Sequence, residues 1–298
     1  MFFINSNRYI LGADIGGSHI TAAIIDGKEH KIVDDTIVRM PVDPSAVSSV
    51  ILDTWAEAIT QVLHKAADAK PGFLAFAMPG PFNYRDGISL IKGLHKYDLL
   101  YGINVKDYLS EHLNLPPHCI GLVNDAQAFL EGEIRVNGYD KLKKTLGVTL
   151  GTGLGTAISY NGNTNDMNFA MLPFLNGFAE EYLSTRWFVS KYNQLSGQTV
   201  SNVKDMLMQE QYTVIDAVFE EFTHNFSQFL VSVINQESIE VVIIGGNIAK
   251  AEDRFLTTLK NDLNKNGVLT KPCNILIANV GELSAMIGAA LQLNENII

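Results

Sequence analysis

The sequence predicts an α/β protein of two similarly built domains, and three observations support this. The chain has 298 residues, a length typical of about two domains, and 47% of them are apolar, which is ample for buried cores. Strand-length and helix-length segments alternate, which favours mainly parallel sheets flanked by helices. The third observation is an internal repeat: LGADIGGSHITAAIIDG at 11–27 and LGVTLGTGLGTAISYNG at 146–162 share six of seventeen positions without a gap.

Each copy of the repeat reads as a strand, a glycine-rich turn and a second strand ending in Asp-Gly or Asn-Gly, a strong hairpin signal. Further strands are predicted at 30–40, 72–78, 119–123, 239–244 and 274–279. Helices are predicted near 46–68, 104–113, 177–194, 203–210, 213–236, 248–265 and 284–293, and one begins at Asp125. We expect an N-terminal α/β domain of residues 1–122 plus 286–298 and a C-terminal α/β domain of residues 123–285.

Charge and composition exclude several classes of function. The 22 basic and 32 acidic side chains give a net charge of 22 − 32 = −10, which disfavours nucleic acid and anionic membranes as partners. The apolar runs are too short for a transmembrane helix, and the N-terminus lacks the pattern of a signal peptide. The two cysteines, Cys119 and Cys273, fit a reduced cytoplasmic setting as packing groups rather than metal ligands.

The first chemical motif is Asp14-Ile15-Gly16-Gly17-Ser18, at the turn of the first hairpin. Paired glycines let backbone N–H groups approach an anion without a Cβ in the way. A carboxylate at the end of the preceding strand is well placed to hold hydrated Mg²⁺ beside a bound phosphate. The alternative interpretation is a hairpin turn that needs glycine for its backbone alone.

The second copy of the repeat carries the same device at Gly151-Thr152-Gly153-Leu154-Gly155. It is not a dinucleotide fingerprint, because no G-x-G-x-x-G/A run starts here and a strand rather than a helix follows. It is not a Walker A loop either, since no Gly-Lys-Ser/Thr follows. Two glycine-rich turns that face each other across a cleft would clamp a polyphosphate from both sides.

Two further motifs follow buried strands. Gly245-Gly246-Asn247 lies where a glycine pair leaves room for a planar ligand, and a strand-to-helix turn capped by Asn247 is the alternative. Asn124-Asp125 opens a helix. Asp125 either favours the helix N-terminus or accepts a proton from a hydroxyl nucleophile. Neither motif decides between its alternatives when taken alone.

Together and in this order, the motifs are far more specific. The sequence resembles the ROK family of sugar kinases, within the actin-like ATPase superfold, from Asp14 to about Leu291. The segments that carry the resemblance are DIGGS (14–18), PGP (79–81), Asn-Asp (124–125), LGTGLGTA (150–157) and IIGGN (243–247). The resemblance implies two actin-like ATPase (ribonuclease H-like) domains with a cleft between them.

The resemblance also implies roles for individual residues. Asp125 would be the catalytic base, and Asp14 would position Mg²⁺ through water. The residues that would contact the sugar are Asn124, Asp125, Glu180 and Gly80. The residues that would line the ATP phosphates are Gly16, Gly17, Ser18, Gly151, Thr152 and Gly153. Gly245 and Gly246 would flank the adenosine.

The sequence departs from the family at residues 161–180, NGNTNDMNFAMLPFLNGFAE. Typical members carry a Glu-x-Gly-His segment and then a cysteine-rich zinc site that ends in Gly-Cys-x-Glu. This stretch has no cysteine or histidine, so it cannot form a Cys₃His zinc site. The end of the pattern matches with Phe178 in place of a cysteine, which makes Glu180 the surviving sugar-ligand candidate. Glu181 is the neighbouring alternative, and a helix-surface salt bridge stays open for both.

The best interpretation is an ATP- and Mg²⁺-dependent hexose kinase, a glucokinase-like phosphotransferase with an alcohol acceptor, cytoplasmic and, by resemblance, a homodimer. The O6 hydroxyl of the sugar would lie against Asp125 and attack the γ-phosphate in line. The alternative is a non-catalytic, sugar-sensing ROK protein or transcriptional regulator. Such regulators carry a helix-turn-helix domain in front, which we do not expect here because the first turn begins at Asp14.

A third class, a chaperone or cytoskeletal ATPase of the superfold, would not need the Asn-Asp pair. The sequence leaves open which hexose or amino sugar is used, because the usual Glu and His are missing. It also leaves open whether polyphosphate replaces ATP.

Overall fold

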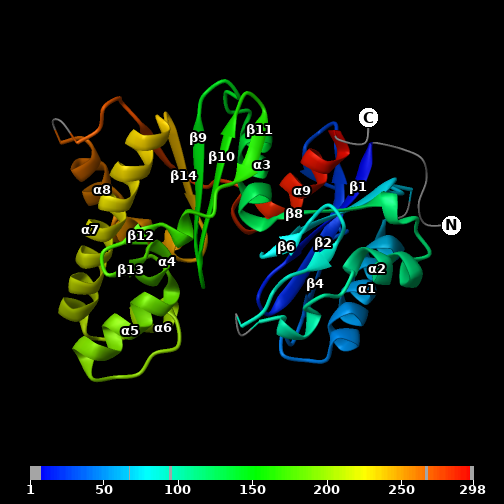
Figure 1. The fold of residues 1–298 in the computed structure, drawn as a ribbon, viewed down its shortest axis with the longest axis horizontal. Helices are drawn as coiled ribbons and strands as arrows, with labels where there is room; N and C mark the ends of the chain where they lie inside the picture. The colour runs from blue at the N-terminus through cyan, green and yellow to red at the C-terminus, as the bar shows by residue number, and fades with distance from the viewer. Residues whose placement is uncertain (1–7, 67, 94–95, 266–267, 296–298) are drawn as a thin grey trace. The chain divides into compact units, whose positions relative to one another are not determined.

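The chain forms two compact units in a computed structural model that describes residues 8–66, 68–93, 96–265 and 268–295 (Figure 1). Unit 1 is Met1–Tyr139 with Glu282–Ile298, and unit 2 is Asp140–Gly281. The expected boundaries, after residues 122 and 285, differ from this division. The difference arises because helix α3 (Asp125–Asn137) packs along helix α9 (Ser284–Glu295) and so belongs to unit 1.

Unit 1 is built on a six-stranded sheet in which the first hairpin is continued by parallel strands. The order is β3-β2-β1-β5-β8, with β4 also paired to β2; β1 and β2 are antiparallel, and β1, β5 and β8 are parallel. The strands are β1 Tyr9–Ile15, β2 His19–Asp26, β3 Lys31–Ile32, β4 Val38–Pro41, β5 Phe73–Met78 and β8 Ile120–Asn124, with a small β6 Phe82–Asn83 and β7 Ile88–Ser89 ribbon. The 3₁₀ turns are η1 Asp98–Leu100, η2 Pro117–Cys119 and η5 Gly281–Leu283.

Helices cover both faces of this sheet (Figure 1). On one face, α1 (Ser48–Lys65) buries Ile51, Trp55, Ile59 and Val62, whose spacing of three or four residues forms one apolar stripe. Helix α2 (Val105–Leu113) packs beside α1. Each such large apolar side chain contributes about 1.5–3 kcal/mol by leaving water. Because α3 and α9 pack on the other face, the carboxyl ends of β1 and β8 are fixed by layers on both sides.

Helix α9 approaches the sheet closely at a glycine. A Cβ on Gly12 of β1 would lie 2.6 Å from the carbonyl oxygen of Met286. On α3, a Cβ on Gly132 would collide with the carbonyl oxygen of Ser284. The Ser284 hydroxyl in turn donates to the buried Glu133 carboxylate of α3. Helix α9 therefore contacts both the strand that carries Asp14 and the helix that carries Asp125.

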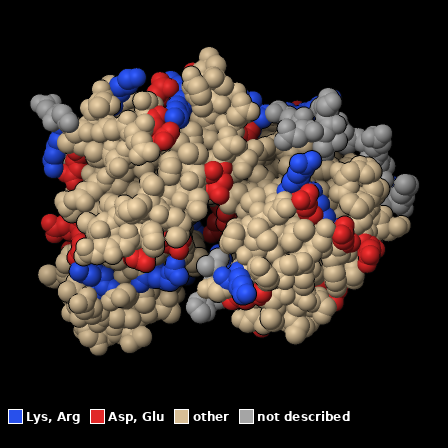
Figure 2. All heavy atoms as spheres, in the orientation of Figure 1, with Lys and Arg blue, Asp and Glu red and all other residues tan. Residues whose placement is uncertain are grey.

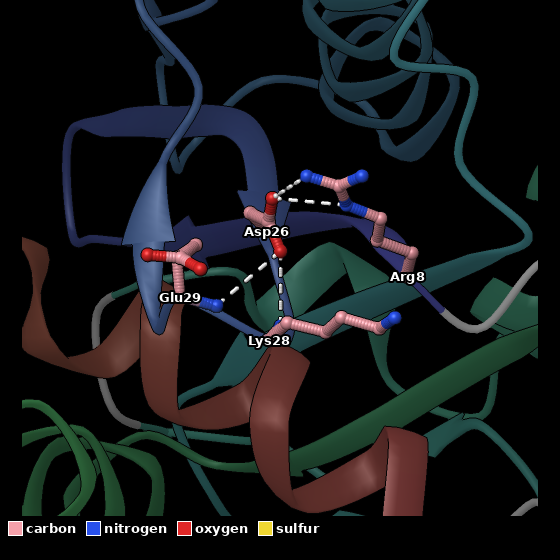
Figure 3. A network of polar contacts seen from close by, with 4 residues as sticks. All are labelled: Arg8, Asp26, Lys28 and Glu29. Atoms are coloured by element: carbon pink, nitrogen blue, oxygen red, sulfur yellow. Dashed lines mark hydrogen bonds and ion pairs between the residues drawn. The ribbon is translucent and has the colours of Figure 1, made fainter.

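The open end of the first hairpin is fixed by a charged network (Figure 3). The guanidinium of Arg8 donates to Asp26 Oδ2 over 3.1 and 2.9 Å, and the N–H groups of Lys28 and Glu29 donate to Asp26 Oδ1 over 3.0 and 3.3 Å. Burial raises the pKa of Asp26, but Arg8 and these two N–H groups outweigh burial and hold the pKa below its usual value.

Unit 2 repeats the hairpin-plus-parallel-strand plan in a five-stranded sheet of order β11-β10-β9-β14-β15. The hairpin is antiparallel, and β9, β14 and β15 are parallel. The strands are β9 Thr145–Leu150, β10 Leu154–Tyr160, β11 Asn163–Asp166, β14 Val241–Gly245 and β15 Asn274–Ile277, with a separate β12 Pro173–Phe174 and β13 Gly177–Phe178 ribbon. The 161–180 segment, which departs from the family pattern, thus forms β11, η3 (Phe169–Met171) and this ribbon.

The helices of unit 2 are α4 Ala179–Tyr182, α5 Thr185–Ser196, α6 Val203–Leu207, α7 Tyr212–Glu237 and α8 Leu256–Leu263, with the 3₁₀ segment η4 Ile248–Arg254. Phenylalanines of α7 form the centre of the core and contact α5. Three predicted elements are interrupted. The 177–194 helix breaks at Leu183 and Ser184, the 248–265 helix breaks at Phe255, and the 30–40 strand breaks at Asp35.

Each interruption has a backbone cause. Leu183, at φ −123° and ψ 33°, is not helical, and the extended Ser184 starts α5 anew. Asp35 takes the left-handed conformation, φ 59°, which separates β3 from β4, each of which pairs with β2. Phe255, at φ −134°, separates η4 from α8. Such single-residue turns carry little signal in an apolar pattern.

Charged side chains of both signs lie next to one another on both units (Figure 2). Within the described residues, no helix combines the length and the apolar character that a membrane span requires.

Candidate phosphate-binding turns and their carboxylates

The first glycine-rich turn, residues 16–18, closes the hairpin of unit 1. The Gly16 N–H donates to the His19 carbonyl over 2.9 Å, and the Val42 N–H donates to the Ser18 carbonyl over the same distance. A Cβ on Gly17 would meet nothing within 4 Å, so the tip of the turn faces open space. This arrangement leaves backbone atoms accessible to an anion.

Tyr97, which was not identified from the sequence, supports this turn through a hydrogen bond. The Tyr97 hydroxyl donates to the Gly16 carbonyl over 2.6 Å, and its fully buried ring meets Trp55 edge-on at 5.5 Å. Tyr97 has a left-handed backbone, φ 57°, and its N–H donates to the Pro44 carbonyl over 2.8 Å. Burial, and then the nearby Asp14, raise the pKa of Tyr97, so its hydroxyl stays a proton donor. No local motif marks this tyrosine in the sequence.

Asp14 lies at the end of β1, as predicted, and interacts electrostatically with Asp125. In the sheet, Asp14 pairs with Ala77 of β5, and Ala77 pairs with Val123 of β8. Asp125 follows Val123 by two residues, so both carboxylates lie at the same edge of the sheet. Burial and the charge of Asp125 raise the pKa of Asp14 to about 7. Two partly buried carboxylates that repel each other form a site that a cation would stabilise.

Two oppositely charged residues, Arg39 and Glu282, change the pKa of Asp14. Arg39 of β4 lowers the pKa of Asp14, whereas Glu282, at the start of the returning segment, raises it. Arg39 and Glu282 form an ion pair of 3.3 Å, and both side chains are more than half exposed. No local pattern in the sequence indicates this pair, because its members are 243 positions apart. The two charges act on Asp14 in opposite directions, and Arg39 acts more strongly than Glu282.

Asn124 caps the helix that Asp125 begins. Asn124 is the N-cap of α3: its Oδ1 accepts from the N–H groups of Ala126 and Gln127 over 2.8 and 3.1 Å. Asp125 Oδ1 also accepts from Ala126, over 2.9 Å. Capping by Asn124 satisfies the helix start, so Asp125 is not needed for that purpose alone.

Gly80 lies beside Asn124, as the resemblance implies. The Asn124 amide donates to the Tyr84 hydroxyl over 3.2 Å, and that hydroxyl donates to the Met78 carbonyl over 3.2 Å. A Cβ on Gly80 would lie 3.1 Å from the same Tyr84 oxygen and 3.9 Å from the Asn124 amide nitrogen. Glycine therefore keeps the approach to Asn124 open.

The second glycine-rich turn, residues 151–153, closes the hairpin of unit 2. The Gly151 N–H donates to the Gly153 carbonyl over 3.0 Å, and the Thr185 N–H of α5 donates to the Gly151 carbonyl over 2.8 Å. Gly246, at φ 88°, follows β14 and packs directly on the Leu150 carbonyl, where a Cβ would collide. The two predicted ATP-side segments of unit 2 are thus adjacent, with Gly245 level with Thr149 of β9.

Glu180 contacts this second turn, and Glu181 does not. Glu180 Oε2 accepts from the Leu154 N–H over 3.0 Å, and its Oε1 accepts from Arg186 over 2.6 Å. Glu181 Oε2 instead accepts from the Phe178 N–H over 3.4 Å, at the start of α4. The salt-bridge alternative is therefore realised for Glu180, but the same carboxylate also accepts from the residue that follows the second turn.

A pocket of about 440 Å³ in unit 2 borders Glu180. Its lining also includes Ser184, Arg186, Phe178 and Trp187. Ser184 is fully buried, and its hydroxyl has no hydrogen-bond partner within the described residues. A polar ligand in this pocket would meet the Glu180 carboxylate.

The donor set of unit 1 suits Mg²⁺ and not zinc. Mg²⁺ is held by one or two carboxylates together with waters and phosphate oxygens, and Asp14 supplies such a carboxylate next to a phosphate-binding turn. Among the residues that the structure describes, no group of three or more His, Cys, Asp or Glu side chains could hold a metal ion by itself. The absence of zinc in the protein stays a prediction.

Comparison with known proteins identifies the family of this chain. The sequence profile of the ROK family matches residues 10–166, so the chain belongs to the ROK family. It is 24% identical to the N-acetyl-D-glucosamine kinase of Mannheimia succiniciproducens, over 80% of this chain and 84% of that protein. It is 25% identical to the polyphosphate glucokinase of Mycobacterium leprae, over 84% of this chain and 67% of that protein.

Solved structures confirm the fold. A ROK family glucokinase from Streptomyces griseus, in complex with glucose and AMPPNP, superposes with a TM-score of 0.75 at 19% identity, over 95% of this chain and 98% of that one. A ROK family transcriptional regulator, a homologue of the E. coli MLC protein, also reaches 0.75, at 15% identity over 98% of this chain and 78% of that one. The predicted actin-like sugar-kinase fold is therefore confirmed.

Proposed function

We propose that this protein is an ATP- and Mg²⁺-dependent sugar kinase that transfers the γ-phosphate to a hexose hydroxyl, O6 in a glucokinase-like reaction. Membership of the ROK family and relatives named as sugar kinases support a phosphotransferase with an alcohol acceptor. The observation that carries the proposal is the proximity of two carboxylates in unit 1: Asp14 at the end of β1, and Asp125 just after β8, whose charge acts on Asp14. This proximity supports the proposal of a base beside an Mg²⁺ ligand.

In this proposal, each unit supplies part of the chemistry. Asp125 accepts the proton of the sugar hydroxyl, and Asn124 and Gly80 border the hydroxyl-binding side of unit 1. Glu180 of unit 2 accepts hydrogen bonds from sugar hydroxyls. The backbones of the two turns bind the phosphates, and Gly245 and Gly246 leave room for the adenosine. Catalysis then rests on positioning and charge stabilisation, as phosphoryl transfer generally requires.

Asp14 would hold Mg²⁺ through water. The bound ion would neutralise charge on the phosphates, which is what the two carboxylates cannot do alone. A bound cation would favour the ionised form of Asp14, whose pKa is raised to about 7 by burial and by Asp125. A cytoplasmic homodimer completes the proposal and is carried by the family resemblance alone.

The second candidate function is a non-catalytic, sugar-sensing regulator, favoured by the structural match to a ROK transcriptional regulator. The two candidates differ in what they need from Asp125. A sensor requires only a hydrogen-bond acceptor there, whereas a kinase requires a base. Product formation separates them.

The direct test is ADP release coupled to product analysis. Purified protein with ATP and Mg²⁺ is offered glucose, mannose, fructose, N-acetylglucosamine and N-acetylmannosamine, with polyphosphate replacing ATP in a parallel series. The proposal predicts that at least one sugar yields its phosphate and ADP in equal amounts. If the protein binds a sugar but forms no phosphorylated product, the sugar kinase is ruled out and the sugar-sensing regulator is the remaining candidate.

Asp125→Asn tests the mechanism. The amide keeps the shape of the side chain but cannot take a proton, so sugar-dependent turnover should fall by about 10²–10⁴-fold. Asp107→Asn, an exposed acid in the first turn of α2, is the matched control and should behave as wild type. Near wild-type turnover in Asp125→Asn would show that Asp125 only supports the start of the helix.

A further inference from the structure

The Glu180 carboxylate is bonded next to the second turn and also faces the pocket of unit 2. One oxygen accepts the Leu154 N–H immediately after the second turn, and the other accepts the Arg186 guanidinium. An ionised carboxylate offers about four acceptor positions, so about two remain for a ligand. The side chain is 32% exposed and lines the pocket of unit 2, so a ligand can reach those positions.

The turn and the carboxylate are also in direct steric contact. A Cβ on Gly153 would collide with Glu180 Oε2, so this glycine lets the turn backbone lie against the carboxylate. A displacement of Glu180 therefore changes both the packing and the hydrogen bonding of the turn. Arg186, which is 69% exposed, donates to the other oxygen of the same carboxylate, Oε1.

We propose that Glu180 couples sugar binding to nucleotide binding, so that an occupied sugar site orders the second phosphate turn and raises the affinity for ATP. The inference rests on the proposed sugar-kinase function. Sugar hydroxyls that donate to the remaining acceptor positions fix the Glu180 rotamer while its bond to the Leu154 N–H is kept. A fixed carboxylate restrains the turn. Because the turn is then ordered before ATP binds, ATP binding no longer carries the entropic cost of ordering it, and the affinity for ATP rises.

Arg186 is a positioning residue in this scheme. Its guanidinium binds the Glu180 carboxylate and would keep Glu180 oriented toward the turn before the sugar binds. Because Arg186 itself is 69% exposed, the contribution of the ion pair to stability is small. Its loss should therefore change the coupling between ligands more than it changes folding.

The test is a binding experiment on the whole protein. The affinity for Mg²⁺–AMPPNP is measured by calorimetry with and without a saturating sugar, using glucose or, if glucose is not phosphorylated, whichever tested sugar is. Wild type should bind the nucleotide about fivefold or more tightly with the sugar present, and the sugar should gain the same factor from the nucleotide. Equal affinities with and without sugar would overturn the coupling.

Variants separate the coupling from a structural role. Glu180→Ala should abolish the coupling factor, Arg186→Ala should reduce it, and Arg186→Lys should restore part of it. Lys191→Ala removes an ion pair with Glu221 from the same helix, 2.6 Å long, and should leave the factor unchanged. An unchanged factor in Glu180→Ala, or an equal loss in Lys191→Ala with a lowered Tm, would contradict the inference.

The two proposals fail in different ways. If wild type phosphorylates no sugar, the proposed function is wrong, whatever the coupling. If wild type phosphorylates a sugar but the nucleotide affinity ignores it, the function stands and the coupling is wrong.

Discussion

The two glycine-rich turns come from the same repeated hairpin but are held by different chemistry. In unit 1, the Gly16 carbonyl of the turn accepts from the hydroxyl of Tyr97, whose ring is fully buried. In unit 2, the Thr185 N–H donates to the Gly151 carbonyl, and the Leu154 N–H after the turn donates to Glu180, a partly exposed carboxylate that borders a pocket. The side chain at the first turn is therefore part of the core, whereas the side chain at the second turn can be reached by a ligand.

The backing of the turns differs as well. Gly17 at the tip of the first turn faces open space, whereas the start of the second turn is covered by Gly246. The repeat therefore supplies the same glycine-rich turn to both units, and different neighbouring residues support the turn in each unit. The repeat specifies the shape of a phosphate turn, and residues outside it decide how rigid that turn is.

The largest expected effect comes from Gly246→Ala. Its backbone is at φ 88°, and the new Cβ would collide with the Leu150 carbonyl, a backbone atom that cannot move aside. We expect a loss of about 3 kcal/mol or more in the free energy of unfolding. Gly17→Ala, which meets open space, should cost less than about 1 kcal/mol. Equal losses in denaturant unfolding would mean that the two turns are supported alike.

Tyr97→Phe removes the support of the first turn. The Gly16 carbonyl loses its 2.6 Å bond, which should cost about 1–2 kcal/mol of stability and raise the KM for ATP several-fold. The KM for the sugar should hardly change, because Tyr97 holds no sugar ligand. Tyr101→Phe, on an exposed ring, is the control for both measurements. A change confined to the sugar KM would contradict the assignment of Tyr97 to the phosphate turn.

The smallest effect concerns the open ends of the hairpins, where Asp26 in unit 1 corresponds to Asn161 in the repeat of unit 2. Asp26→Asn makes the ends alike and should lower stability at pH 7 by about 1 kcal/mol. The folded pKa of Asp26 lies below the unfolded value near 3.9, so its stabilisation is complete above about pH 4. It is lost as pH falls through the folded pKa.

Thermal unfolding across pH checks this sign. The difference in Tm between wild type and Asp26→Asn should be constant from about pH 5 to 7 and should shrink below about pH 4. A difference that grows in acid would mean that the network in Figure 3 does not lower the pKa of Asp26.

The sequence predicted the elements that depend on local patterns. Both hairpins, the strand before Asn124 and the helix after it were found, because alternation, glycine pairs and caps are encoded within a few residues. The family resemblance placed the candidate carboxylates. Breaks such as Leu183 and Asp35 were missed, since a single backbone conformation hardly alters an apolar pattern.

The supports of the site were missed for a different reason. Tyr97 reaches Gly16 across 81 positions, and Arg39 pairs with Glu282 across 243. Such contacts arise from the topology of the sheet and helices, and no short motif records them. Glu180 was identified by pattern, but its contact with Leu154 became evident only in three dimensions.

Sugar binding is expected to order the second turn and to leave the first turn unchanged. Amide hydrogen exchange followed by NMR tests this residue by residue. The exchange is measured without nucleotide, in the presence and absence of the sugar that the protein phosphorylates. Sugar should slow exchange at the Leu154 N–H and leave the N–H of Gly17 unchanged, and Glu180→Ala should remove the effect. Equal slowing at both turns, or none at Leu154 in a protein that binds and phosphorylates the sugar, would contradict the account.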